Sequence, residues 1–317
     1  MEKAYIGVDV GGMSVKGGIV TKDGKIVHKE VVKTDCRNGA TLFLKDTKNL
    51  LVSLINFAHN NGYEIDGIGF GIPGVVNNKL GIIDYATNLH FNDVHLKEYL
   101  NDLNIPIYLT NDANAAALAE QKFGAGKNYK DVVFVTLGTG IGGGIVIDNK
   151  LFEGYEGRGG EIGHMVIVVN GDQCNCGRKG CFERYASATA LLKFTKESML
   201  NDKDSLMWEY CHNDINNVDG STSFECAKKG DKTANEVIDK YIMYLGEGLL
   251  NICNIFRPQA IILGGGVSNQ GDYLKNKVEK YLKDNHYGYK ATPKVDVLIA
   301  TLKNDSGIIG AASIAFK

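Results

Sequence analysis

Proline is scarce in this chain of 317 residues, with only four, and neither sign of charge prevails. The formal net charge is −2 at pH 7, so no general basic field favours nucleic acid or an anionic membrane surface. No stretch approaches the roughly 18 apolar residues of a membrane span. The N-terminus enters a strand pattern at once and lacks the marks of a secretory signal. We therefore expect a cytoplasmic protein of one large or two medium domains, with no nucleic-acid or membrane partner.

Two common nucleotide-binding motifs are missing or misplaced. The P-loop pattern G-x-x-x-x-G-K-[ST] does not occur. Gly138, Gly140 and Gly143 do satisfy G-x-G-x-x-G. A dinucleotide site requires a helix directly after this motif, whereas the β-branched stretch GGIVIDNK predicts a hairpin. The predicted hairpin argues against a Rossmann-type site.

The cysteine content argues against a disulfide framework, because seven is an odd number and no secretory signal is recognised. Four of them are scattered, and we interpret them as reduced, buried thiols: Cys36, Cys211, Cys226 and Cys253.

The remaining cysteines follow a histidine with the spacing H-x9-C-x-C-x4-C. The set is His164, Cys174, Cys176 and Cys181. Three thiolates and an imidazole form a complete tetrahedral ligand set for structural Zn²⁺, and the alternative is a cluster of reduced thiols. Glu161 and Glu183 flank the set, so a metal that made this loop rigid would also fix two carboxylates.

Glycine is abundant, with 39 residues. Its clusters follow or join β-branched runs, which indicates an α/β protein whose loops approach a ligand closely. Two such segments, starting at Ile6 and Val133, resemble each other: strand, Gly-rich turn, strand, polar turn. This duplication predicts two related lobes, each of which contributes one Gly-rich hairpin to a shared cleft.

Gly-rich hairpins can bind phosphate through successive backbone N–H groups, although they can also be plain tight turns. The presence of two such hairpins, with Asp9 at the end of the first strand, favours phosphate binding. An aspartate at that place can hold Mg²⁺ through water. Asn111 and Asp112 lie where a strand meets a helix, so Asp112 can act as a general base, or the pair can simply cap the helix.

Apolar periodicity predicts the main helices. They cover residues 41–62, 113–124, 233–256, 273–284 and 307–317. The last of them is rich in small residues and is expected to pack closely against a neighbour.

Taken together, the motifs resemble the ROK family of sugar kinases and repressors. The stretches that carry the resemblance are VDVGGMSVKGGIV, TNDANAAALAE, LGTGIGGGIV, GGEIGH with CNCGRKGCFE, PQAIILGGGVS and NDSGIIGAA. They run from about residue 6 to residue 312, which is nearly the whole chain.

The resemblance implies an α/β, two-lobed, actin-like or hexokinase-like (ribonuclease H-like) fold with a zinc-binding loop. Residues 1–115 would form a smaller N-terminal lobe, with a C-terminal helix, 303–317, packing back on it. Residues 116–302 would form a larger lobe with the zinc loop and the nucleotide site.

The resemblance also implies site residues. Nucleotide contacts would come from Asp9, Gly11, Gly12, Ser14, Lys16, Gly138, Thr139, Gly140, Gly264, Gly265 and Gly266. Sugar contacts would come from Asn88, Asn111, Asp112, Glu161, His164 and Glu183. Asp112 would be the catalytic base, and His164 would serve zinc with one ring nitrogen and the sugar with the other. Glu183 would be a rigid sugar acceptor, because it stands two residues after a zinc ligand.

The chain departs from the family pattern at two places. Met13 replaces the usual threonine of the first hairpin, where Ser14 can supply a hydroxyl, and Ser306 replaces a common alanine. The repressors of the family carry a helix-turn-helix before this core. In this chain the first hairpin begins by residue 9, so we expect no such segment.

The implied activity is phosphorylation of a hexose by ATP with Mg²⁺ and a structural Zn²⁺, and glucose to glucose 6-phosphate is the favoured reaction. The implied assembly is a homo-oligomer, a dimer or a tetramer. The alternatives are N-acetylmannosamine or another hexose as substrate, polyphosphate as donor, and a non-catalytic sugar sensor. Sugar choice depends on pocket shape around residues 70–90 and 153–161. Loss of zinc is expected to act through the sugar site and to affect nucleotide contacts less.

Overall fold

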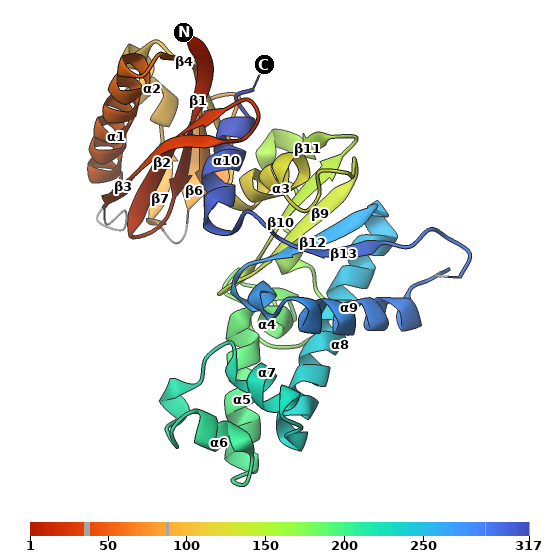
Figure 1. The fold of residues 1–317 in the computed structure, drawn as a ribbon. Coiled ribbons are helices and arrows are strands. Elements are labelled where there is room, and N and C mark those ends of the chain that lie inside the picture. The colour runs from red at the N-terminus through yellow and green to blue at the C-terminus, as the bar shows by residue number, and fades with distance from the viewer. Residues whose placement is uncertain (35–38, 87–88, 289, 317) are drawn as a thin grey trace. The chain divides into compact units, whose positions relative to one another are not determined.

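The computed structural model describes residues 1–34, 39–86, 89–288 and 290–316 (Figure 1). The chain divides into two compact units. The first comprises Met1–Phe134, Gly144–Gly160 and Thr301–Lys317, and the second comprises Val135–Gly143 and Glu161–Ala300. Cys36 and Asn88, for which the sequence predicts a buried thiol and a sugar contact, lie outside the described residues.

Two five-stranded sheets have the same order of strands. The first has the order β3-β2-β1-β4-β8, with β1 Glu2–Val10, β2 Ser14–Thr21, β3 Ile26–Lys33, β4 Tyr63–Ile72 and β8 Ile107–Asn111. The second has the order β11-β10-β9-β12-β13, with β9 Val132–Leu137, β10 Ile141–Ile147, β11 Lys150–Phe152, β12 Ala260–Gly264 and β13 Asp296–Ile299. The same strand order thus occurs twice, and the strand β10 after LGTG confirms the predicted hairpin.

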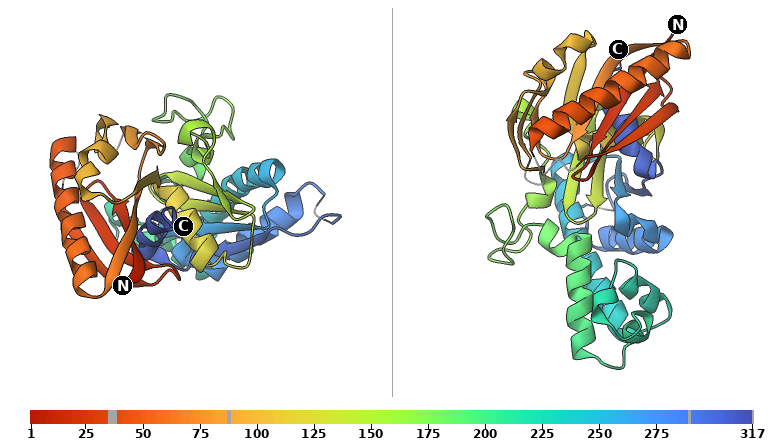
Figure 2. Two further views of the ribbon diagram at one scale, coloured as in Figure 1. Left: turned by 90° about the horizontal axis from the view of Figure 1, so that it is seen from above. Right: turned by 90° about the vertical axis from the view of Figure 1, so that its left-hand side faces the viewer.

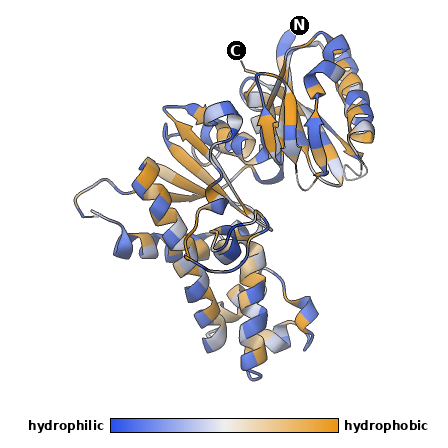
Figure 3. Cartoon of the chain, turned by 180° about the vertical axis from the view of Figure 1, so that it is seen from behind, coloured by the Kyte–Doolittle hydropathy of each residue, from blue (hydrophilic) through white to orange (hydrophobic). Residues whose placement is uncertain are grey.

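A third, smaller sheet belongs to the first unit. It has the order β5-β6-β7, formed by Val75–Asn77, Ile82–Ala86 and Phe91–Val94. Figure 3 shows the strands of the five-stranded sheets as mostly hydrophobic and the helices as having mixed faces.

The predicted helices are present with small shifts at their ends. They are α1 Ala40–Asn60, α3 Asp112–Phe123, α8 Lys232–Phe256, α9 Asp272–Asn285 and α10 Ser306–Ser313. The chain leaves α10 before residue 317, and the ring of Phe316 packs on Tyr5 with ring centroids 4.7 Å apart. Helices that were not predicted are the 14-residue α5 Ala188–Asn201 and the short α2 Leu96–Tyr99, α4 Glu183–Ala186, α6 Leu206–Tyr210 and α7 Thr222–Lys228. Within the described ranges, no helix has both the length and the apolar character to cross a membrane.

The alternation of side chains along β1 decides which helix covers which face of the first sheet. Ile6 and Val8 belong to the core formed with α1, whereas Tyr5 packs with Ile308 and Ala312 of α10. The ribbon in Figure 2 shows α1 and α10 on opposite faces of this sheet. The backbone of α10 comes so close that a Cβ on Gly7 would lie 1.9 Å from the carbonyl oxygen of Ile308. The expected close packing of this small-residue helix is therefore confirmed.

The fully buried carboxylate of Glu120 holds the segment by which the chain re-enters the first unit. Glu120 of α3 has no exposed surface, and its carboxylate accepts hydrogen bonds from the backbone N–H groups of Ala125, Thr301 and Leu302 at 2.8–2.9 Å. These donors satisfy a charge that would otherwise be costly to bury. The segment that leads into α10 is thereby tied to α3.

Candidate functional site

The first Gly-rich hairpin joins β1 to β2 in the first unit. Its turn is closed by the N–H of Gly11, which donates to the Ser14 carbonyl at 2.9 Å. Asp9 and Lys16 face each other across the two strands, and Lys16 Nζ lies 3.2 Å from Asp9 Oδ2. Met13 stands at the tip with 62% of its surface exposed.

Asp9 lies on the face of β1 that α10 covers. A Cβ on Gly307, in the first turn of α10, would lie 2.7 Å from the Asp9 carboxylate carbon. Gly307 lies in the motif NDSGIIGAA, and the sequence suggested no separate role for it. The contact between Gly307 and Asp9 explains why this position needs a residue without a side chain.

Asn111 and Asp112 stand where β8 passes into α3. Asn111 caps the helix, because its side-chain oxygen accepts from the N–H of Ala113 at 2.9 Å, as the capping alternative predicted. Its amide group also donates to the Gly74 carbonyl at 3.1 Å, which ties the GFGIPG loop to the end of β8. Asp112 is the first residue of α3 and is exposed, and one of its oxygens accepts from the same Ala113 N–H at 2.9 Å.

The two stretches on which sugar choice was expected to depend are joined within the first unit. Arg158 Nη2 lies 2.9 Å from Asp84 Oδ2 of β6. Nearby in sequence, Glu153 accepts a 2.7 Å hydrogen bond from the hydroxyl of Thr110, which directly precedes the Asn111–Asp112 pair. The segment 153–158 is therefore fixed to both β6 and β8.

The second Gly-rich turn lies between β9 and β10, in the second unit. The N–H of Gly138 donates to the Gly140 carbonyl at 3.1 Å, and Thr139 is exposed. Gly265 has a φ of 78°, and a Cβ on it would lie 2.6 Å from the carbonyl of Leu137. Only glycine suits both the backbone conformation and this close approach. The predicted nucleotide segments 138–140 and 264–266 are therefore neighbours.

The helices α4 and α5 supply bonds to this second turn that the sequence did not predict. The N–H of Ala188 donates to the Gly138 carbonyl at 2.8 Å, and the Thr189 hydroxyl donates to the Thr139 carbonyl at 2.7 Å. Glu183 accepts a hydrogen bond from the N–H of Ile141 at 3.1 Å through Oε2. The other predicted carboxylate, Glu161, is exposed and precedes the short 3₁₀ helix Ile162–His164.

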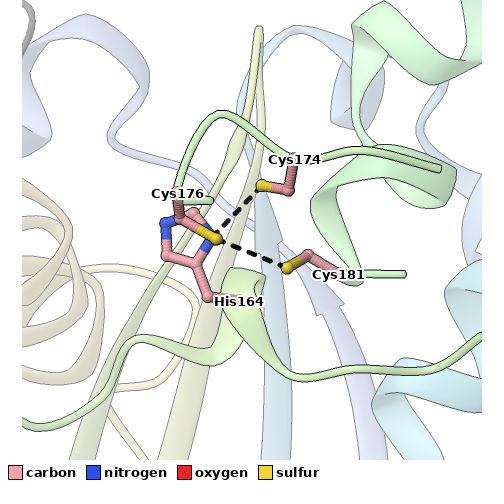
Figure 4. A group of neighbouring side chains, drawn as sticks. All are labelled: His164, Cys174, Cys176 and Cys181. Atoms are coloured by element: carbon pink, nitrogen blue, oxygen red, sulfur yellow. Dashed lines mark hydrogen bonds between the residues drawn. The ribbon is translucent and has the colours of Figure 1, made fainter. Parts of the chain in front are cut away.

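The predicted metal ligands come together in one cluster (Figure 4). The ligand atoms of His164, Cys174, Cys176 and Cys181 all lie within 4.8 Å of one another. The Cys176 and Cys181 sulfurs are 3.6 Å apart, and Cys174 Sγ is 3.7 Å from His164 Nδ1. A tetrahedral zinc ion separates two sulfurs by about 3.8 Å and a sulfur from a nitrogen by about 3.5 Å, given its usual bond lengths. The donor set and its spacing therefore fit zinc, with Nδ1 as the histidine ligand atom.

The loop that carries the cysteines is a short knuckle with its own backbone bonds. Val166 pairs with Cys181 and Gln173 pairs with Lys179, in antiparallel bridges. Burial raises the pKa of Cys181 to about 12, whereas a backbone hydrogen bond at Arg178 lowers the pKa of the exposed Cys176. A zinc ion held here would bind these cysteines as thiolates, and ligand deprotonation of this kind makes zinc affinity depend on pH.

Within each unit, the structure assembles most of the residues that the sequence singled out. The first unit contains Asp9, Gly11, Gly12, Ser14, Lys16, Asn111 and Asp112. The second contains Gly138, Thr139, Gly140, Gly264, Gly265, Gly266, Glu161, His164, Glu183 and the three cysteine ligands. The scattered cysteines at 211, 226 and 253 are buried, free thiols, as predicted.

Comparison with known proteins decides the family. The model of the ROK family matches residues 5–317. The chain belongs to the ROK family. Its fold is accordingly the actin-like or hexokinase-like α/β fold that the resemblance implied.

Individual relatives of this ROK protein include enzymes and repressors. It is 36% identical to a glucokinase from Halalkalibacterium halodurans, over 98% of this chain and 94% of that protein. It is 31% identical to the xylose repressor of Bacillus subtilis, over 98% of this chain and 76% of the repressor. Among solved structures, it is similar to a ROK family glucokinase from Streptomyces griseus in complex with glucose and AMPPNP, with a TM-score of 0.81, 32% identity and 98% of each chain covered.

Proposed function

We propose that glucose is the substrate of this ATP-dependent hexose kinase and that the product is glucose 6-phosphate. The support for glucose is the similarity to glucokinases over nearly the full length, at 34–36% identity. The observation that supports the chemistry is the position of Asp112, an exposed carboxylate directly after β8. Its neighbour Asn111 is held in place by hydrogen bonds of both its side-chain oxygen and its amide group.

In the proposed reaction, Asp112 accepts the proton of the sugar 6-hydroxyl as the hydroxyl oxygen forms a bond to the γ-phosphorus of ATP. The bond between that phosphorus and the β–γ bridging oxygen breaks, and ADP leaves. Mg²⁺, when bound with the nucleotide, neutralises phosphate charge, and Asp9 would orient it through water. Lys16 and the backbone N–H groups of the two Gly-rich turns would stabilise the charge on the transferred group. Asn111, Glu161, His164 and Glu183 would hold the sugar hydroxyls, so that positioning supplies most of the rate increase.

His164 can serve two partners in this scheme. Its Nδ1 faces Cys174 in the metal cluster, so Nε2 is the ring nitrogen directed to a sugar hydroxyl. Zinc on Nδ1 would fix the tautomer with its proton on Nε2, and that nitrogen would then donate a hydrogen bond. A closed four-ligand zinc site would be structural, because it leaves no open position to activate water.

A coupled assay of ATP-dependent phosphorylation across a sugar panel tests the proposal. The panel comprises glucose, mannose, N-acetylglucosamine and N-acetylmannosamine, each with ATP and, separately, with polyphosphate. We expect glucose with ATP to give the highest kcat/KM. A higher value for N-acetylmannosamine would contradict the assignment of glucose, and sugar binding without turnover of any sugar would point to a sensor.

A further inference from the structure

The second Gly-rich turn is fixed by side chains and backbone from outside its own hairpin. Gly138, Thr139 and Ile141 each make one hydrogen bond to the segment 183–189, at 2.8, 2.7 and 3.1 Å respectively. All of these partners belong to the second unit. The path of the turn therefore depends on where α4 and α5 place their first residues.

Glu183 has the closest approach to the turn. A Cβ on Gly140 would lie 2.1 Å from Glu183 Oε2 and 3.0 Å from its carboxylate carbon. The carboxylate thus occupies the space beside Gly140 that a side chain would fill. Its hydrogen bond to the Ile141 N–H orients the peptide that follows Gly140, and the N–H groups of Thr139 and Gly140 precede it in the same tight turn.

Glu183 follows the zinc loop in sequence, and the residues next to it pack against α8. The zinc ligand Cys181 is two residues earlier, and the N–H of Phe182 donates to the Met165 carbonyl at 2.7 Å. The ring of Phe182 is fully buried and packs so tightly on Gly248 of α8 that a Cβ there would lie 2.2 Å away. One turn later, the hydroxyl of Tyr241 donates to the Ala186 carbonyl at 2.8 Å. The Glu183 backbone is therefore fixed on both sides.

We propose that Glu183 is a positioning residue for the triphosphate of the nucleotide. Its carboxylate sets the geometry of the turn 138–141, so that the backbone donors of the turn are ordered before ATP arrives. This inference rests on the proposed function only in taking that turn as the phosphate-binding turn. It gives Glu183 a role beyond the sugar contact that the family resemblance implies, and it places the zinc loop next to the nucleotide site through one side chain.

Electrostatic repulsion predicts the opposite effect of Glu183 on nucleotide binding, and this makes the proposal testable. A carboxylate beside a triphosphate repels it, so neutralising Glu183 would strengthen nucleotide binding if repulsion outweighed positioning. Glutamine keeps the size of Glu183, but its neutral oxygen is a weaker acceptor for the Ile141 N–H. The sign of the effect of Glu183→Gln on nucleotide affinity therefore separates the two expectations.

The experiment measures calorimetric binding of AMPPNP with Mg²⁺, and of AMP, to zinc-loaded protein without sugar. Glu161→Gln is the matched control, because Glu161 is also a predicted sugar carboxylate, is exposed and flanks the same loop. Thr189→Val removes the hydroxyl bond to Thr139 and tests the positioning of the turn independently of the zinc loop. We expect Glu183→Gln and Thr189→Val to weaken AMPPNP binding by roughly 5- to 50-fold, because the first replaces a charged acceptor by a neutral one and the second removes a hydrogen bond. AMP binding should stay within about 3-fold in both variants, and Glu161→Gln should match wild type for both ligands.

Two results would overturn the proposal. The first is AMPPNP binding by Glu183→Gln that equals or exceeds that of the wild type. The second is an equal loss of AMP and AMPPNP affinity, which would indicate general damage rather than positioning of the β- and γ-phosphates. Since no sugar is present, the result is independent of the glucose assay, and a different preferred hexose would contradict the proposed substrate alone.

Discussion

The two Gly-rich turns arise from similar sequences but are stabilised in different ways. The first turn, between β1 and β2, is closed by the Gly11–Ser14 backbone bond, and the Asp9–Lys16 ion pair spans its own two strands. The second, between β9 and β10, receives hydrogen bonds from α4 and α5, including that of Glu183. A duplicated unit can therefore keep its strand order while its loops come to depend on different parts of the chain.

This difference has a functional consequence. The hydrogen bond and the ion pair of the first turn join residues within about eight positions of one another, although α10 also packs against Asp9. The geometry of the second depends on contacts between residues more than 40 positions apart in sequence, and on the zinc loop next to Glu183. Substitutions that affect one turn but not the other can test this contrast. Their expected effects range from a large loss of activity to a small gain in nucleotide affinity.

Asp112→Asn should give the largest effect and serves as the reference, because it leaves both turns intact. Asparagine keeps the size of the side chain and can still bond the Ala113 N–H, but it cannot accept the proton of the sugar hydroxyl. We expect kcat to fall by about 100-fold or more, with AMPPNP and glucose affinities largely kept. Steady-state kinetics and calorimetry check both parts, and a variant that retained more than about a tenth of the wild-type rate would refute the base assignment.

Loss of zinc should come next and should affect the second turn. Cys176→Ser is the best variant, because Cys176 is the exposed ligand and its replacement costs little packing. Misplacement of Glu183 and His164 by about 1 Å can lower kcat/KM for the sugar by about 100-fold. The sequence alone suggested that nucleotide contacts would be less affected, whereas the Glu183–Ile141 bond leads us to expect weaker AMPPNP binding as well.

Elemental analysis and calorimetry measure this outcome. We expect one zinc per wild-type chain and less in Cys176→Ser. The matched control is Cys253→Ser, at a buried free thiol of α8 that is not part of the metal cluster. A fully active wild-type protein without metal would show that zinc is not needed, and normal AMPPNP binding by Cys176→Ser would break its link to the second turn.

Alanine at one glycine of each turn compares the two turns directly. The new Cβ at Gly140 would overlap the Glu183 carboxylate at 2.1 Å, whereas at Gly11 it would lie 3.3 Å from the Ser14 carbonyl. We expect Gly140→Ala to weaken AMPPNP binding by about 10-fold and Gly11→Ala by less, in line with the different steric conflicts. Removing the Glu183 side chain as well should make the Gly140→Ala effect smaller, since the two changes share one contact. Strictly additive effects of Gly140→Ala and Glu183→Ala would show that the contact is unimportant.

Met13→Thr should have the smallest effect and concerns the first turn only. Residue 13 is exposed at the tip, so the free energy of unfolding should change by less than about 0.5 kcal/mol. A threonine hydroxyl adds one donor where the family usually has one, and we expect AMPPNP affinity to rise by about 2- to 5-fold. Thermal unfolding and calorimetry measure the two quantities, and an unchanged affinity would indicate that Ser14 already supplies the hydroxyl.

Sequence patterns predicted the features that depend on short-range order. The long amphipathic helices, the hairpin after LGTG and the cysteine spacing of the metal cluster all act over a few tens of residues, and the structure confirms them. The helices α4, α6 and α7 escaped detection because they have only 4 to 7 residues. α5 was missed although it has 14 residues and its buried residues Ala190, Leu191 and Phe194 have helical spacing. The Glu183–Ile141 bond was missed for a different reason: it joins two loops that come close only after the strands and helices have packed. The roles of Asp112 and the sugar residues remain predictions of the family pattern.

The Glu120 bonds to residues 301–302 bear on the order in which the chain folds during synthesis. The second unit ends at Ala300, so the ribosome has completed it before the last segment of the first unit emerges. Until then, the Tyr5 face of the first sheet lacks its cover from Ile308, Ala312 and Ala315. Contacts between such distant parts of a chain form slowly, and exposed apolar strands favour aggregation. The part of the molecule that is made first is therefore the last to finish, and a chain that ended before Thr301 would leave the Glu120 carboxylate buried without two of its donors.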